Sequence, residues 1–311
     1  MAKNTKTNTE TNTETNNITV KTKEEVKNMA ITNKIDFAVI IAVEGGNPNG
    51  DIDSNRPRTI DYNGCEFGFI TDVCMKRKIR NRLQDMEYDI LVQADDRCTD
   101  EAKTLRERIM KEGFDKIKDK EERIRAVCLK YADVRAFGTV ATYLTENFNV
   151  RGPVTIRNVE SFDPIEIESQ DITSGFHRGD KDDKEYKAKE SSSIGKKHFV
   201  KFGLYKLFGS INVQMAEKTG FSADDAAALK EALRTLFVND ESAARPAGSC
   251  EVVKVFWFEH NCKIGQYSPA KIDRAITAKL VDGVTTPMSI DDYEITYNEL
   301  EGLKYEIIDG F

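Results

Sequence analysis

Apolar residues follow two different periods along the chain, and the strongest segments mark two strands and two helices. The continuous, β-branched apolar run at 35–43 predicts a buried strand, and EVVKVFWF at 251–258 predicts another. A helix is predicted from Thr71 or Asp72 to about Met86, with its apolar residues on one side. The segment 222–238 begins with capping-box spacing and continues into an alanine-rich interior, so it predicts the second helix.

Weaker patterns lie between these elements. Residues 99–130 are strongly charged with an apolar stripe and predict a helix, while 150–156 and 198–213 are strand-like segments interrupted by glycines. The resulting order is strand, helix, strand, strand, helix, strand. We therefore predict an α+β fold of the ferredoxin-like type, a modified RRM with βαββαβ order, enlarged by insertions at about 95–130 and 170–197.

Composition divides the chain into three parts. Residues 1–33 begin as an Asn/Thr/Lys/Glu mixture without apolar content, which predicts a disordered tail. Residues 34–260 hold the predicted RRM-like domain, and the charged segment 177–197 predicts a mobile surface loop or a projecting hairpin. Residues 261–311 carry nine acidic and five basic side chains, and we expect this acidic extension to pack on the same domain.

Overall composition narrows the class of protein. Hydrophobic residues make up 39% and charged residues 32% of the 311 positions, which is typical of a soluble globular protein. The longest apolar run, 37–43, is far too short to cross a bilayer. Six cysteines without a close pair indicate reduced thiols and a cytoplasmic location. With no CxxC motif and three histidines, the sequence predicts neither a structural zinc site nor any other metal or cofactor.

The candidate chemistry is a polar loop followed by a basic helix. The loop after the first strand, 45–58, is rich in Gly, Asn and Pro and leads into the helix predicted from Thr71. Five of the seven residues 76–82 are Lys or Arg, and no acid lies within this run. We therefore expect these cations to be available to a phosphate backbone. The net charge of −7 is compatible with this because the positive charge is segregated.

Six motifs in order resemble one family: NPNGD, FITDVCMKRKIRN, VRAFG, VRGPV, GKKHFVKFGLY and SAAR. Over about residues 35–260, the chain resembles the RNA-binding backbone subunit of the type I-C CRISPR Cascade complex, a branch of the Cas-seven group. The resemblance implies a palm with projecting fingers and thumb, in a non-catalytic subunit that polymerises head to tail along a CRISPR RNA. The guide bases would stay free to pair with target DNA. Further partners would be the repeat-handle-binding, large and small subunits of Cascade.

The same resemblance suggests which residues grip the sugar-phosphate backbone. The helix cations would be the principal phosphate contacts, the loop donors would lie along the same path, and the basic residues of the later motifs are lesser candidates. The complete candidate set is Asn47, Asn49, Arg56, Lys76, Arg77, Arg80, Arg135, Arg151, Lys196, Lys197 and Arg245.

Two other functions fit parts of the sequence. Asp51 and Asp53 could hold Mg²⁺ for phosphodiester cleavage, which would make the chain a metal-dependent ribonuclease. Alternatively, the chain is a structural filament protein whose cations face solvent and which makes no direct contact with RNA.

Overall fold

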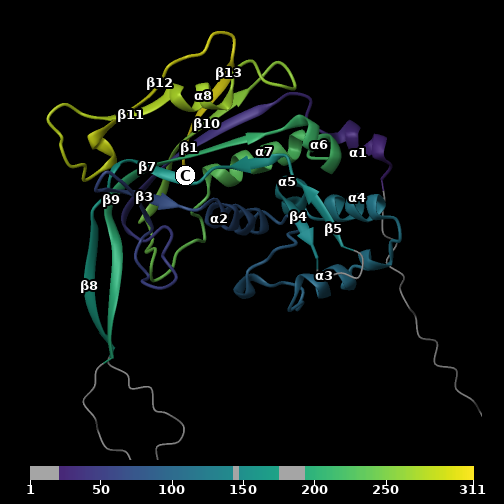
Figure 1. Cartoon of the computed structure of the whole chain (residues 1–311), viewed down its shortest axis with the longest axis horizontal. Helices are drawn as coiled ribbons and strands as arrows, with labels where there is room; N and C mark the ends of the chain where they lie inside the picture. Colours follow the sequence, from purple (N-terminus) through teal and green to yellow (C-terminus); the bar gives the residue numbers. More distant parts are fainter. Residues whose placement is uncertain (1–20, 143–146, 175–192) are drawn as a thin grey trace, which may run out of the picture.

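A computed structural model of the chain describes residues 21–142, 147–174 and 193–311. In this part of the chain, the centre is a nine-stranded sheet whose paired strands all run antiparallel (Figure 1). In chain order its strands are β1 (Ile35–Gly46), β2 (Thr59–Tyr62), β3 (Cys65–Ile70), β6 (Val154–Ile156), β7 (Val159–Pro164), β8 (Ile167–Ser174), β9 (Ser193–Ile211), β10 (Cys250–Glu259) and β13 (Lys304–Asp309). The main path across the sheet is β13-β10-β1-β9-β7-β3-β2, and β6 and β8 pair with β9 outside this path.

Strand β1 lies in the middle of the sheet, and its apolar run is buried on both faces. Phe37 belongs to one hydrophobic core and its neighbour Ala38 to the other, which explains why the run is continuous rather than alternating. Phe37 stacks on Trp257 of β10 with ring centroids 5.7 Å apart. A Cβ added to Gly209 of β9 would lie 2.2 Å from the Phe37 ring. Glycine is therefore required at this position.

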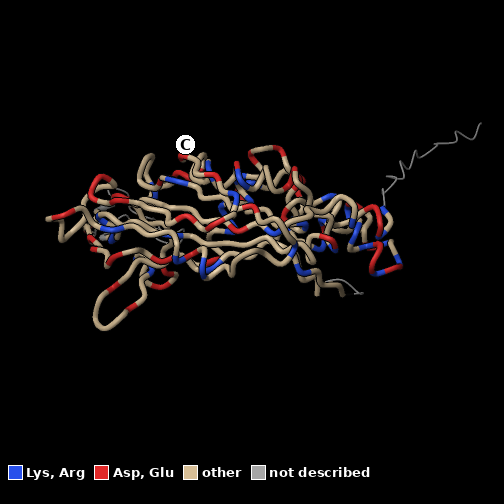
Figure 2. The backbone as a smooth tube through the Cα atoms, turned by 90° about the horizontal axis from the view of Figure 1, so that it is seen from above, with Lys and Arg blue, Asp and Glu red and all other residues tan. Residues whose placement is uncertain are grey.

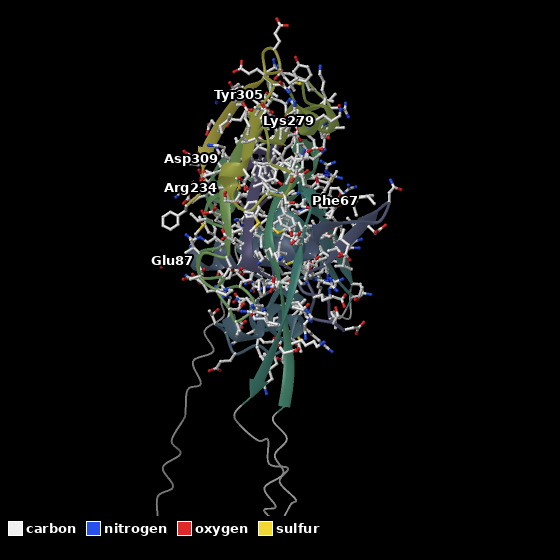
Figure 3. All side chains as sticks on the ribbon, turned by 90° about the vertical axis from the view of Figure 1, so that its left-hand side faces the viewer. Phe67, Glu87, Arg234, Lys279, Tyr305 and Asp309 are labelled. Carbon is white, nitrogen blue, oxygen red and sulfur yellow. The ribbon has the colours of Figure 1, made fainter. Side chains whose placement is uncertain are left out.

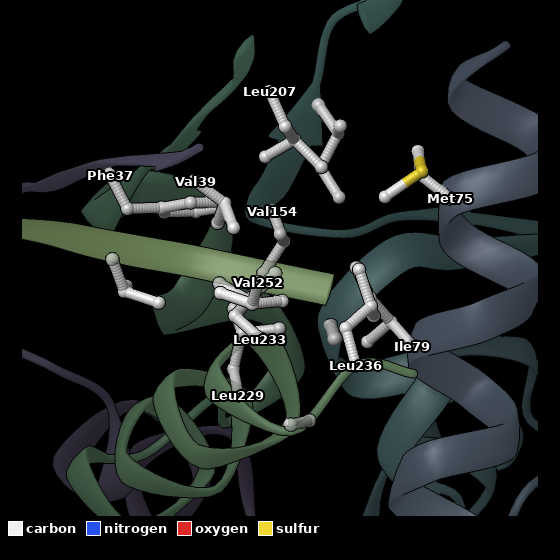
Figure 4. Packing of buried hydrophobic residues seen from close by; sticks show 14 of the residues in the cluster. Phe37, Val39, Met75, Ile79, Val154, Leu207, Leu229, Leu233, Leu236 and Val252 are labelled. Atoms are coloured by element: carbon white, nitrogen blue, oxygen red, sulfur yellow. The ribbon is translucent and has the colours of Figure 1, made fainter. Parts of the chain in front are cut away.

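The first core lies between the sheet and two helices, α2 (Asp72–Asp85) and α7 (Ala223–Arg234) (Figure 4). Met75 and Ile79 from α2 and Leu233 from α7 are fully buried in it. Both helices lie within the segments predicted from the sequence, because each has an N-cap side chain at its start and one apolar face.

The second core covers the opposite face of the sheet and is built by the C-terminal segment. Its elements are α8 (Pro269–Ala275), β11 (Ile276–Leu280), the 3₁₀ helix η3 (Ile290–Asp292) and β12 (Tyr293–Tyr297). Ile272 and Tyr293 are buried there against β1, β9 and β10. Because β13 also pairs with β10, the acidic segment after residue 260 is continuous with the sheet.

A helical lobe built from residues 95–142 and 147–151 lies beside the sheet (Figure 1). The single helix predicted over 99–130 is wrong: α3 ends at Lys111, and Gly113 follows with a φ of 77°, a conformation that favours glycine after a helix. The lobe has its own core around Ile109 and Val127. Its elements are η1 (Asp95–Arg97), α3 (Leu105–Lys111), η2 (Phe114–Lys116), α4 (Lys120–Lys130), α5 (Ala132–Phe137), β4 (Gly138–Ala141) and β5 (Phe148–Arg151).

The N-terminal segment contains a helix where the sequence analysis predicted disorder. Helix α1 (Lys23–Met29) begins with a capping box and packs on α6 (Val213–Thr219) through the buried Val26. The predicted tail boundary at residue 33 is therefore wrong, while residues 1–20 lie outside the described part of the chain. None of the described helices is long and apolar enough to cross a membrane.

Strand β8 and the paired part of β9 extend past the other strands of the sheet as a long projecting hairpin (Figures 1 and 3). Of the charged segment 177–197, residues 193–197 belong to β9, and the remainder lies outside the described residues. Seen from above, the molecule is elongated, and Lys and Arg alternate with Asp and Glu along most of its length (Figure 2). Whether a given Lys or Arg side chain is available to a ligand therefore depends on its own partners.

Candidate nucleic-acid interface

The basic helix α2 uses buried cations to hold the fold together. Lys78 is buried and forms an ion pair with Asp240, in the connection between α7 and β10. Arg80 Nε lies 2.9 Å from Asp133 Oδ2 of the helical lobe, and the Asp133 side chain is only 1% exposed. These contacts tie α2 to two parts of the chain that are distant in sequence, so neither cation is held ready for a ligand.

Lys76 and Arg77 also have partners within the chain. Lys76 Nζ lies 2.8 Å from Asp72 Oδ2, one helical turn earlier. Arg77 Nη1 donates to the carbonyl of Val92 at 2.6 Å, and burial lowers the pKa of its guanidinium from the ordinary value. The expectation that α2 presents an unpaired row of cations is therefore wrong, because the acid that pairs with Lys76 lies just outside the basic run.

The loop asparagines fix the loop against the start of α2. Asn47 is buried, and its Nδ2 donates to the carbonyl of Asn55 at 2.8 Å. Asn49 Oδ1 accepts from the backbone N–H of Thr71 at 3.0 Å and from the Thr71 hydroxyl at 3.2 Å. Because Thr71 is the N-cap of α2, Asn49 ties the loop to the start of the helix, while Asn47 holds the loop itself together.

Asp51 closes the tip of this loop. Its Oδ1 accepts from the backbone N–H groups of Asp53 and Ser54 at 3.1 and 3.3 Å, and its Oδ2 lies 3.2 Å from Arg58. The hydrogen bond from the Ser54 backbone is the main cause that lowers the pKa of Asp51. Arg56 is the more exposed cation of the loop, with its side chain 46% exposed and its Nη2 3.8 Å from Glu66 Oε2.

Arg135 and Arg245 are structural in the folded chain. Arg135 holds both carboxylate oxygens of Asp225, with Nη2–Oδ1 at 2.7 Å and Nε–Oδ2 at 3.0 Å, and donates to two carbonyls at the end of α4. Arg245 Nε lies 2.8 Å from Asp240 Oδ2. The first pair joins the lobe to α7, and the second forms one cluster with Lys78.

Lys196 and Lys197 lie on the projecting hairpin. In the register of β8 and β9, Lys196 is opposite Asp171 and Lys197 is opposite Gln170. Lys196 is exposed and Lys197 is half-buried. Outside the backbone pairing of the two strands, neither lysine side chain forms an ion pair or hydrogen bond with another described residue, so no described residue occupies either amine.

Arg151 lies in a groove along the side of the molecule. Three cavities of about 550, 590 and 690 Å³ are neighbours that share wall residues: Arg151 and Met215 line the first and second, and Arg157 lines the second and third. The first cavity lies between α1, α4, β5 and α6. The other two pass over β6, β7 and β9 toward α8 and the start of α2. We call these three cavities together the groove.

The charged lining of the groove favours an anionic ligand. Seven cations and five acids line it, a balance of +2 in a chain whose net charge is −7. The cations are Lys23, Lys34, Arg125, Arg151, Arg157, Lys206 and Lys218, and the acids are Asp72, Glu121, Glu160, Glu217 and Asp273.

The sequence analysis missed six of the seven groove cations, and Arg157 and Lys206 are two of them. The Arg157 guanidinium carbon lies 4.8 Å from the centroid of the Phe208 ring, and the side chain is 58% exposed. The available signal was VRGPVTIRN, in which Arg151 and Arg157 stand six residues apart around a short apolar strand. Lys206 carried no comparable signal because it lies within the long β9.

The described residues contain no group of three His, Cys, Asp or Glu side chains that could hold a metal ion. His260 Nε2 lies 2.8 Å from Asp36 Oδ2, and both side chains are fully buried beside Lys34. This polar network joins the start of β1 to the end of β10 beneath the groove, which makes it a structural feature.

The structure defines a mixed α+β protein with a central antiparallel sheet and a positively charged groove. A sequence model of the family described as CRISPR-associated protein Cas7 matches residues 33–298, and the chain belongs to this family.

The individual relatives share less than a third of their residues with this chain. A CRISPR-associated protein Cas7 from Haloferax volcanii is 28% identical over 222 residues, which cover 63% of this chain and 62% of that protein. The match therefore spans less than two thirds of the relative's length. A chain of a CRISPR RNA-guided surveillance complex in a pre-nicking state has 13% identity and a TM-score of 0.48, covering 72% of this chain and 78% of its own. A second surveillance-complex chain has 16% identity and a TM-score of 0.45, with coverages of 72% and 68%.

Proposed function

We propose that this chain is a non-catalytic subunit of a type I-C CRISPR Cascade complex and binds the sugar-phosphate backbone of the CRISPR RNA. The family match over residues 33–298 supports the class of protein. The single observation that carries the RNA contact is the groove of three neighbouring cavities with its positively charged lining. A guide carrier has to accept any spacer sequence, so its contacts go to phosphates and 2′-hydroxyls and leave the bases free to pair with target DNA.

The palm of this subunit is RRM-like. Its four strands are β1, β7, β9 and β10, with α2 between β1 and β7 and α7 between β9 and β10. Their order across the sheet is β10-β1-β9-β7, with every pair antiparallel, which supports the βαββαβ arrangement. In this assignment the helical lobe and the β8–β9 hairpin are the finger and thumb insertions.

The direct phosphate contacts come from the cations that the fold leaves accessible. We assign this role to Arg56, Arg151, Lys196 and Lys197. Arg56 is 46% exposed and has only a solvent-exposed ion pair with Glu66 at 3.8 Å, and the other three have no ion pair with a described residue. The other candidates act as positioning residues, because their side chains already have partners within the loop, α2, the lobe or the connection before β10. These are Asn47, Asn49, Lys76, Arg77, Arg80, Arg135 and Arg245.

Copies of the chain assemble head to tail along the RNA in the cytoplasm. Such a contact joins two different surfaces and does not close into a ring, so it makes an open filament whose length another component limits. The further Cascade partners are the repeat-handle-binding, large and small subunits, together with target DNA paired to the guide.

The chain acts without cutting RNA. The Asp51 carboxylate is engaged by its own loop and by Arg58, which supports a structural role for the residue that the ribonuclease alternative requires. Bound RNA is expected to stay intact during incubation with Mg²⁺. Metal-dependent cleavage that disappears in Asp51→Ala would replace this part of the proposal with the ribonuclease function.

The test is co-expression of the tagged chain with a CRISPR array and the companion subunits. The 260-to-280 nm absorbance ratio of the purified particle and sequencing of its RNA are the measurements. We expect repeat-flanked spacer RNA in a large assembly. A nucleic-acid-free filament under these conditions would overturn RNA binding and favour the structural-protein alternative.

A further inference from the structure

An acidic side chain from the C-terminal segment lies between two cations of the groove. Asp273 of α8 places Oδ2 2.6 Å from Arg157 Nη2 and Oδ1 3.0 Å from Lys206 Nζ. The three residues line the same cavity, and the Asp273 side chain is 17% exposed. A carboxylate therefore occupies the position at which an anionic ligand would meet both cations.

The two cations differ in what else holds them. Lys206 is 21% exposed and also donates to the carbonyls of Asp273 and Ile276 at 3.1 and 3.3 Å. These carbonyls belong to the last turn of α8 and its C-cap, where a cation is favourable. Lys206 therefore anchors α8 to the sheet whether or not the Asp273 carboxylate is charged.

Arg157, by contrast, is positioned so that its guanidinium can change from the Asp273 carboxylate to another anion. Its backbone N–H donates to the carbonyl of Phe208 at 3.0 Å, and its guanidinium lies over the Phe208 ring. With 58% of the side chain exposed and five N–H donors, the guanidinium can bind a second anion while it keeps its orientation. Because the guanidinium side of the pair is open to solvent, its attraction to Asp273 is screened by salt, and a polyanion can compete for it.

We propose that Arg157 is a phosphate-binding residue of the groove and that Asp273 is its internal competitor. This inference rests on the proposed function, since the competing ligand is the RNA backbone. In the RNA-free chain the carboxylate holds the guanidinium over Phe208. In the bound chain a phosphate takes over part of the guanidinium, and Asp273 is left with Lys206. The carboxylate thereby lowers the affinity of this contact and disfavours isolated small anions.

The test is a double-mutant cycle on the full chain, with binding of a 5′-fluorescein-labelled 30-nucleotide polyuridine followed by anisotropy. Asp273→Asn keeps the shape of the side chain and removes its charge, and we expect binding to tighten roughly two- to fivefold. Arg157→Ala is expected to weaken binding and to lower the slope of log affinity against log salt by about 0.7. Asp273→Asn in the Arg157→Ala background is expected to change nothing further.

Several outcomes would overturn the inference. Unchanged or weaker binding by Asp273→Asn would show that the carboxylate does not compete, and a gain that persists without Arg157 would show that it acts on another residue. If Asp273→Asn does not fold, as judged by thermal unfolding, the salt slopes of the wild-type chain and of Arg157→Gln decide, and equal slopes exclude a phosphate contact. A wild-type chain that binds no RNA at all would overturn the proposed function together with this inference.

Discussion

At the scale of the residue, an arginine or lysine is structural or available according to the nearest acid in the folded chain. Arg80 is a residue of the first kind, because its partner Asp133 is buried and also accepts from the backbone N–H of Leu91 at 2.8 Å. Arg151 is a residue of the second kind, because it is exposed on the groove and has no ion pair with a described residue. The sequence analysis ranked them in the opposite order, with Arg80 among the principal phosphate contacts and Arg151 among the lesser candidates.

Arg80→Ala is therefore expected to lower the free energy of unfolding rather than the affinity for RNA. Removing the guanidinium leaves the buried Asp133 carboxylate without its counterion, at a cost of about 2–4 kcal/mol. Urea unfolding followed by circular dichroism measures this, with the exposed Lys279→Ala as the matched control, expected within about 0.5 kcal/mol of wild type. Normal stability combined with much weaker RNA binding would instead make Arg80 a phosphate ligand.

At the scale of the element, long apolar patterns were sufficient to predict a helix or strand, and short patterns were not. The sequence predicted β1, α2, α7 and β10 because each has a continuous or periodic apolar set buried against a large core. Helix α1 was missed because seven residues with one buried side chain give almost no periodic signal. The usable signal was local: Thr22 and Glu25 stand three apart and form a capping box.

Val26→Asp is expected to detach α1 from α6. The substitution places a charge at a position that is 5% exposed and packed against Gly220. Amide hydrogen exchange is expected to rise in α1 and α6, and RNA affinity is expected to fall because Lys23 leaves the groove wall. Lys27→Asp puts the same residue on the exposed side of α1 and is the control. Equal exchange in the two variants would contradict the docked position of α1.

The helical lobe is expected to lose stability in acid through Asp100. Arg108, whose side chain is 5% exposed, donates to both Asp100 oxygens, and these hydrogen bonds hold the pKa of Asp100 well below its ordinary value of about 3.9. The unfolded chain therefore binds this proton first, so the stabilisation is present above about pH 4 and is lost as the pH falls toward the folded pKa.

The measurement is thermal unfolding of the wild-type chain and of Asp100→Asn at pH 7 and pH 3. Asp100→Asn is expected to be less stable than wild type at pH 7, and the difference is expected to shrink at pH 3 because the wild-type contribution fades. A difference of the same size at both values would show that the carboxylate charge is not what stabilises the lobe.

At the scale of the whole molecule, the groove could not be predicted because no segment of the chain contains it. Its lining joins residues as distant as Lys23 and Asp273. The acids that neutralise α2 have the same origin, since Asp133 and Asp240 are 53 and 162 residues away from the cations they bind. The local sequence shows where cations are abundant, but which of them remain available for a ligand depends on the tertiary fold.

The proposed RNA path is tested by comparing two variants that lose different sets of cations. Arg151→Ala, Lys196→Ala and Lys197→Ala in one chain remove three accessible cations from the groove and the hairpin. Because each lost phosphate contact removes about 0.7 from the salt slope for single strands, the slope is expected to fall by about 2. The loss of affinity is expected to be equal for two RNAs of unrelated sequence and the same length, since phosphates carry no sequence information.

The contrast variant is Lys76→Ala with Arg77→Ala, whose cations already have partners and whose slope is expected to stay near that of wild type. A reduced slope in the contrast variant but not in the triple variant would place the RNA on α2, and a loss confined to one RNA would contradict backbone binding.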